Sequence, residues 1–143
     1  MRLAYWGLVA GALCCTAMAK DTTRESKVQA ALARELAGLT PGTPQSCLNT
    51  FETRNASAQS FGDTLVYRTT GSRRYVTVTT GCTDIGGNGD NILITKTFST
   101  QLCRGDIATT VDRTSHFFSG SCSFGDFVPY TRAPGAALPH KPQ

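Results

Sequence analysis

The spacing of apolar residues changes along the chain and divides it into parts. An unbroken apolar run covers residues 3–15, and an apolar stripe with helical spacing follows over 25–39. From Cys47 the pattern alternates and is rich in Thr, Val, Ile and aromatic residues, which suit a pleated sheet. We therefore expect one N-terminal helix followed by a β-rich domain.

The first apolar run indicates an export signal. Arg2 precedes it, and Ala17 and Ala19 follow it with the small-residue spacing that signal peptidase recognises. A bilayer-spanning helix needs about 20 apolar residues, so the run is too short to be one. We predict a signal peptide over 1–19 and a mature chain, without a transmembrane segment, that begins at Lys20.

The end of the run also leaves an alternative open. Cys14 and Cys15 lie where a lipid-modified cysteine would stand, but Leu13 replaces the small residue that usually precedes such a thiol. We expect a periplasmic or secreted protein, with a lipid-anchored envelope protein as the alternative.

Residues 20–46 are interpreted as a helix and a linker. The predicted helix covers 25–39 and ends at the turn-forming segment 40–42. Its apolar stripe consists of Val28, Leu32, Leu36 and Leu39.

Residues 47–130 are predicted to form the β domain, and the proline-containing segment 131–143 a disordered tail. We predict strands over 48–55, 61–70, 73–80, 91–98, 106–113 and 124–130, with a tight turn at 70–72. Short strands joined by loops favour a small antiparallel sheet or partly closed barrel.

Four cysteines remain after cleavage, and an even number in an exported chain predicts two disulfides. Three pairings are possible; we favour Cys82 with Cys103 and Cys47 with Cys122, because a hairpin could join the inner two. The chain lacks the closely spaced C-x-x-C pairs of zinc sites and redox centres. We expect structural bridges, no metal site and no cofactor.

The charge of the chain is modest, with 14 Lys and Arg against 10 Asp and Glu. This balance argues against a nucleic-acid partner. Arg68, Arg73 and Arg74 cluster around the predicted turn, where they form either a solvated surface or a contact for an anionic envelope polymer.

A glycine-rich loop offers oxygen ligands at Asp84, Asn88 and Asp90, which is the spacing that calcium sites use. Thr95 stands where an EF-hand would place its closing Glu. A flexible Gly/Asn/Asp loop is the simpler interpretation.

His116 follows Asp112 and Ser115, which suggests a hydrolase. On a continuous strand, positions 112 and 116 would lie about 13 Å apart, too far for a hydrogen bond. The chain has no G-x-S-x-G motif, so we expect no catalytic residue.

Two short motifs have ordinary explanations. The adhesion-like tripeptide at 104–106 follows a cysteine and is predicted to be a turn before a strand. Asn55 begins a glycosylation sequon, which matters only in a eukaryotic secretory pathway.

Three segments appear in a characteristic order: LAGLTPGTPQSCL at 36–48, LCRGDI at 102–107 and SCSFGDFVPY at 121–130. Their order and cysteine placement resemble a family of small exported bacterial proteins described as a domain of unknown function. The resemblance covers about 36–131 and implies a Gram-negative periplasm or envelope, where many relatives look like lipoproteins. It brings no catalytic residue, substrate or cofactor.

The sequence thus predicts a non-catalytic exported domain that binds an envelope protein or polymer or has a structural role. The alternatives are an inhibitor or regulator of an exported enzyme and a calcium-responsive module.

Overall fold

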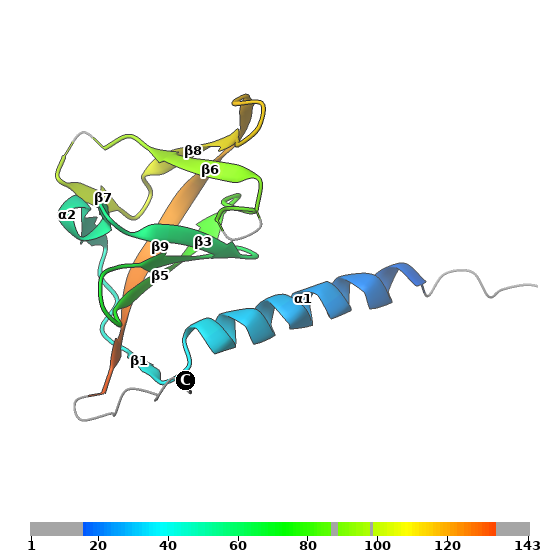
Figure 1. Ribbon diagram of the computed structural model, residues 1–143, viewed down its shortest axis with the longest axis horizontal. Helices are drawn as coiled ribbons and strands as arrows, with labels where there is room; N and C mark the ends of the chain where they lie inside the picture. Colours follow the sequence, from blue (N-terminus) through cyan, green and yellow to red (C-terminus); the bar gives the residue numbers. More distant parts are fainter. Residues whose placement is uncertain (1–15, 87–88, 98, 134–143) are drawn as a thin grey trace, which may run out of the picture.

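The protein is mostly β-strand with one long N-terminal helix, as the sequence predicts. The structure is a computed structural model that describes residues 16–86, 89–97 and 99–133 (Figure 1). In chain order its elements are α1 (Thr16–Glu35), β1 (Leu39–Pro41), β2 (Cys47–Asn49), α2 (Thr50–Thr53), β3 (Ser57–Phe61), β4 (Thr64–Arg68), β5 (Arg74–Thr80), β6 (Asn91–Thr95), β7 (Gln101–Cys103), β8 (Ile107–Asp112) and β9 (Phe118–Arg132).

The main sheet is antiparallel and has the order β3-β4-β5-β9-β8-β6, with β1 added to β9. The long strand β9 pairs with β5 along one half and with β8 along the other. Opposite Val78, β9 bulges at Gly125 and Asp126, since the register shifts between Thr77 and Thr79. A bulge bends its strand. The sheet curls so far that it forms a nearly closed barrel, with β3 and β6 as its two edge strands.

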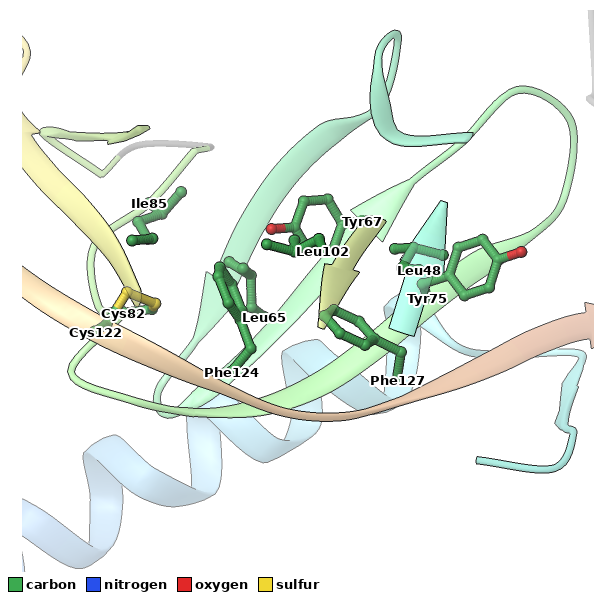
Figure 2. Packing of buried hydrophobic residues seen from close by; sticks show 11 residues of the cluster. Leu48, Leu65, Tyr67, Tyr75, Cys82, Ile85, Leu102, Cys122, Phe124 and Phe127 are labelled. Carbon is green, nitrogen blue, oxygen red and sulfur yellow. A yellow bond between two sulfur atoms is a disulfide. The ribbon is translucent and has the colours of Figure 1, made fainter. Parts of the chain in front are cut away.

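The inner face of the curled sheet carries the main core. Phe124 and Phe127 both point inward because the bulge lies between them, and their ring centroids are 6.0 Å apart. A separate two-stranded sheet, β2 with β7, places Leu48 and Leu102 in the same core. Figure 2 shows this packing. The buried members are Leu48, Leu65, Tyr67, Tyr75, Cys82, Ile85, Leu102, Ala108, Cys122, Phe124 and Phe127.

Helix α1 covers the outer face of the sheet over β3, β4 and β5. A second buried cluster consists of Phe61, Val66 and Val76, and the helix packs Val28, Ala31, Leu32 and Leu36 against it. Figure 1 shows the N-terminal end of α1 projecting beyond the sheet. None of the helices in the described residues is long and apolar enough to cross a membrane.

The helix differs from its prediction at both ends. It begins at Thr16, and it stops at Glu35 rather than at Leu39, which instead opens β1. The segment 39–41 is extended because it pairs with the end of β9, a partner that local sequence cannot reveal. Most of the predicted signal peptide, with Cys14 and Cys15, lies outside the described residues.

Two disulfides form, but the favoured pairing was wrong. Cys47 bonds to Cys103, and Cys82 bonds to Cys122. Cys47 and Cys103 are direct cross-strand partners in the β2–β7 sheet. Cys82 follows β5, whose neighbour in the sheet is β9, and β9 carries Cys122. The favoured scheme assumed that strands adjacent in the chain pair with each other, whereas β5 pairs with the last strand.

Two other predictions need correction. The strand expected over 48–55 ends at Asn49, because the Asn49 side chain accepts the Phe51 N–H at 2.9 Å and caps the short helix α2. The predicted tail begins too early, since β9 continues through Arg132 and pairs with β1. Residues 134–143 lie outside the described part of the chain.

Candidate functional site

A cavity of about 400 Å³ opens between the two edge strands of the sheet, β3 and β6. Its volume is in the range of small-ligand sites. Most of its walls are apolar or carry hydroxyl and amide groups. The lining residues are Thr53, Ala56, Ala58, Tyr67, Ile85, Gly86, Asn91, Ile92, Leu93, Thr95, Leu102 and Arg113.

One end of the gap between β3 and β6 is filled by the chain itself at Ile85. The Ser60 N–H of β3 donates to the Ile85 carbonyl at 2.8 Å, and Ile85 forms a parallel bridge with Asn91 of β6. Gly86 follows with a φ of +66°, and a Cβ there would clash with the Ala58 carbonyl oxygen, so this close approach requires glycine. Ile85 therefore acts as a one-residue strand that joins both edges, and the cavity occupies the remaining length of the gap.

Tyr67 lines the cavity with its side chain, and its buried hydroxyl has no partner among the described residues. Tyr67 is only 5% exposed, and its hydroxyl oxygen has no hydrogen-bond partner in the part of the chain that the structure describes. Burial raises the pKa of Tyr67, so the hydroxyl stays protonated and can donate. A buried polar group without a partner is costly, about 1–3 kcal/mol. The described part of the protein leaves this donor unsatisfied.

Tyr75, the cross-strand neighbour of Tyr67, has the hydrogen-bond partner that a buried tyrosine hydroxyl usually finds. Its hydroxyl donates to the Glu52 carboxylate of α2 at 2.6 Å, although the side chain is equally buried. Burial, with that hydrogen bond, raises the pKa of Tyr75. In Figure 2 the two hydroxyl groups point in opposite directions, that of Tyr67 towards the Ile85 side. The fold thus provides a hydrogen-bond acceptor for the Tyr75 hydroxyl and, among the described residues, none for the Tyr67 hydroxyl.

The described lining residues of the cavity include few groups that can ionise. Arg113 is the only charged side chain among the described lining residues, and these include no histidine, cysteine or carboxylate. His, Cys and carboxylate side chains are the commonest groups in nucleophilic and general acid–base catalysis. Across the described residues, no three His, Cys, Asp or Glu side chains converge to hold a metal ion.

A larger groove of about 710 Å³ lies between α1 and the β3–β4 turn. Its helical wall is mostly exposed and charged, with Arg24, Glu25 and Lys27. Neither of the buried polar atoms that lack a partner among the described residues belongs to a residue lining it. The cavity between β3 and β6 is therefore the better candidate.

The predicted arginine cluster does not form one solvated surface. Arg68 donates to both oxygens of Glu35 on α1, at 2.7 and 2.8 Å, and Arg74 donates to the same carboxylate at 3.0 Å. Arg73 instead lies near Glu52, with an N–O distance of 3.6 Å. These cations fasten α1 and α2 to the sheet and are not available as one patch for an anionic polymer.

The residues around His116 are closer together than a continuous strand would allow. Strand β8 ends at Asp112, and a turn brings the His116 N–H to the Asp112 carbonyl at 2.9 Å, with His116 at a φ of +58°. The Ser115 hydroxyl donates to the Asp112 carboxylate at 2.8 Å. The Ser115 backbone N–H is the main cause that lowers the pKa of Asp112. The cluster is an exposed turn in which the serine bonds the carboxylate and not the histidine.

The remaining motifs occupy loops. The tripeptide at 104–106 forms the turn between β7 and β8, where the Asp106 carboxylate accepts the Cys103 N–H at 2.7 Å, as predicted for a turn. Asp84 and Asp90 are exposed, and the Asp84 carbonyl accepts the Asn91 N–H at 2.9 Å, whereas Asn88, the third proposed calcium ligand, lies outside the described residues. Asn55 is exposed after α2.

No family model, curated protein or solved structure matches this chain. The cavity was also missed by sequence reasoning, because Tyr67 reads as an ordinary aromatic residue in an alternating strand. Its only sequence signal is a tyrosine at an inward position, where a buried hydroxyl needs a partner.

Proposed function

We propose that this chain is an exported, non-catalytic binding domain whose ligand occupies the cavity between β3 and β6. The observation that carries the proposal is the Tyr67 hydroxyl, a buried donor that the described residues leave without a partner. Apart from Arg113, the described cavity wall is uncharged, which favours an uncharged or weakly polar ligand group beside Tyr67. The ligand belongs to an envelope protein or polymer.

The two disulfides fit an extracellular or envelope location, because thiols are oxidised outside the cytosol. The predicted signal peptide and the resemblance to small exported bacterial proteins support the periplasm as the specific compartment. A small domain with two covalent links also suits a rigid, preformed site.

The test is a screen of small neutral compounds, each with one hydrogen-bond acceptor, against the isotope-labelled mature protein by NMR. Compounds that bind in the cavity are expected to shift the amide signals of Ala58, Leu93 and Leu102. Tyr67→Phe should weaken their affinity about tenfold, since a lost buried hydrogen bond costs about 1–2 kcal/mol.

Tyr130→Phe is the matched control, because it removes the same group from a tyrosine that packs with the outer cluster and does not line the cavity. It should leave the affinity unchanged. The proposal is wrong if no compound shifts the cavity amides, or if Tyr67→Phe and Tyr130→Phe weaken binding equally.

A further inference from the structure

We infer that the ligand is an extended segment of another polypeptide, which enters the gap between β3 and β6 as an added strand and completes the barrel. This inference rests on the proposed function and specifies its ligand. Strand addition at a free sheet edge is a common mode of peptide recognition, with main-chain hydrogen bonds supplying much of the affinity.

The free edge of β6 has the required backbone groups. In an antiparallel pair, alternate residues direct both N–H and C=O to the partner strand. The Arg113 N–H donates to the Asp90 carbonyl at 2.7 Å, so Ile92 and Ile94 are the residues that bond β8. Leu93 and Thr95 therefore direct their N–H and C=O groups to the gap, as does Asn91, whose N–H donates to the Asp84 carbonyl at 2.9 Å.

The edge of β3 faces them across the cavity. The Ser60 N–H points to the gap, since it donates to Ile85. The alternation then turns the Ala58 N–H in the same direction. Neighbouring strands in the sheet order are antiparallel, so β3 and β6 run in opposite directions. Ile85 contacts Ser60 of β3 and Asn91 of β6. Ala58 therefore lies opposite the part of β6 that follows Asn91. Ala58, Leu93 and Thr95 all line the cavity.

Ile85 shows that the gap is one strand wide. It bonds to β3 on one side and bridges to β6 on the other, which is what an inserted strand would do along the whole gap. Asn91 is already bonded to Asp84 and bridged to Ile85, so the edge left for a ligand runs from Leu93 to Thr95, about 7 Å or roughly two to three extended residues. Any strand between two antiparallel edges must lie parallel to one and antiparallel to the other, and Ile85 already has a parallel bridge to β6.

The walls define the side chains that fit. A residue of the added strand that points into the barrel meets Tyr67, Leu93 and Leu102. A small side chain with a hydroxyl, such as serine or threonine, would fill this space and pair with the Tyr67 hydroxyl.

The experiment uses short random peptides displayed on phage and selected on the mature protein, followed by amide hydrogen exchange with a synthesised selected peptide. In the free protein, the amides of Leu93 and Thr95 should exchange faster than those of Ile92 and Ile94. Bound peptide should slow amide exchange at least tenfold at the residues that face the gap, which are Leu93, Thr95 and Ala58. The exchange rates of Ile92 and Ile94 should stay nearly unchanged. This alternating pattern is specific to an added strand.

Thr95→Pro removes the N–H that faces the gap and should weaken the peptide at least tenfold. Thr95→Ala keeps that N–H and should bind within about twofold of wild type. The exchange pattern of the wild-type protein is an independent readout that holds even if the proline variant does not fold.

The outcomes separate the two proposals. If neutral compounds bind beside Tyr67 but no selected peptide slows Leu93 and Thr95, the added strand is overturned and the binding function stands. If neither compounds nor peptides affect the cavity amides, both are overturned. Equal affinities of the two Thr95 variants would also contradict the added strand.

Discussion

The two sides of the barrel differ in how many of their strand edges and buried hydroxyl groups have partners. On the closed side, β4, β5 and β9 pair on both edges, α1 covers the outer face, and the Tyr75 hydroxyl has a carboxylate partner. On the open side, β6 and β8 leave apolar residues exposed. Among the described residues, β6 beyond Asn91 has no partner at its outer edge and the Tyr67 hydroxyl has no hydrogen-bond partner. Protein interiors seldom leave such groups unpaired.

This difference separates the contacts that hold the helix to the sheet from the region proposed to bind a ligand. The closed side contains the apolar packing and the ion pairs that hold α1 to the sheet. The open side retains an edge and a donor that an added ligand would satisfy. Native proteins usually protect a free edge, so an unprotected one beside a cavity is consistent with a binding role.

The largest expected effect comes from the Cys47–Cys103 bridge, which fixes β2 to β7 and so holds Leu102 in the cavity wall. Replacing both cysteines by alanine should lower the free energy of unfolding by about 4 kcal/mol, because the bridge restricts a long loop in the unfolded chain. Urea denaturation measures this.

Peptide mapping of the unreduced protein accompanies that measurement. It should find the peptides of Cys47 and Cys103 linked, and those of Cys82 and Cys122 linked. Recovery of a Cys82–Cys103 peptide would contradict the paired strands described above.

The next effect compares two valines on the outer face of the sheet. Val66 is fully buried beneath α1, whereas Val78 is 65% exposed beyond the helix. Val66→Ala should cost about 2 kcal/mol and Val78→Ala less than about 0.5 kcal/mol. Thermal and urea unfolding measure both, and equal costs would mean that α1 does not pack on the sheet in solution.

A third effect concerns the attachment of α1 through Glu35. Hydrogen bonds from Arg68 and then from Arg74 hold the pKa of Glu35 below its ordinary value of 4.5. Glu35→Gln should cost about 1–2 kcal/mol at neutral pH, reduced from a fully buried pair by solvent screening.

The sign of the pH dependence follows from the lowered pKa. The ionised Glu35 stabilises the fold fully above pH 4.5, and this stabilisation is lost as the pH falls through its lower folded-state pKa. The stability difference between wild type and Glu35→Gln should therefore shrink below pH 4.5. A difference that is constant from pH 7 to pH 3 would refute the ion pairs.

The smallest effect compares the two buried tyrosines. Tyr75→Phe removes the hydrogen bond to Glu52 and should cost about 1 kcal/mol. Tyr67→Phe removes a hydroxyl without a described partner and should be neutral or slightly stabilising in the free protein. If Tyr67→Phe costs as much as Tyr75→Phe, the Tyr67 hydroxyl already has a partner in the free protein and the cavity loses its main polar group.

Local patterns determined much of the fold. The stripe of Val28, Leu32 and Leu36 predicts the helix and its buried face, since helical spacing brings these residues to one side whatever they pack against. Branched and aromatic residues with alternation predict the strands, and the turn at 70–72 joins β4 to β5 as expected. The even number of cysteines predicts two bridges. These features depend on neighbours in the chain.

The tertiary structure alone decided which distant segments meet. The pairing of β5 with β9, and of β2 with β7, set the disulfides, and no local pattern specifies either. The bulge at Gly125 and Asp126 turns both Phe124 and Phe127 inward, against simple alternation. The cavity exists because the curled sheet stops one strand short of closure. The Tyr67 hydroxyl stands out only in the tertiary structure, where it is buried without a partner among the described residues.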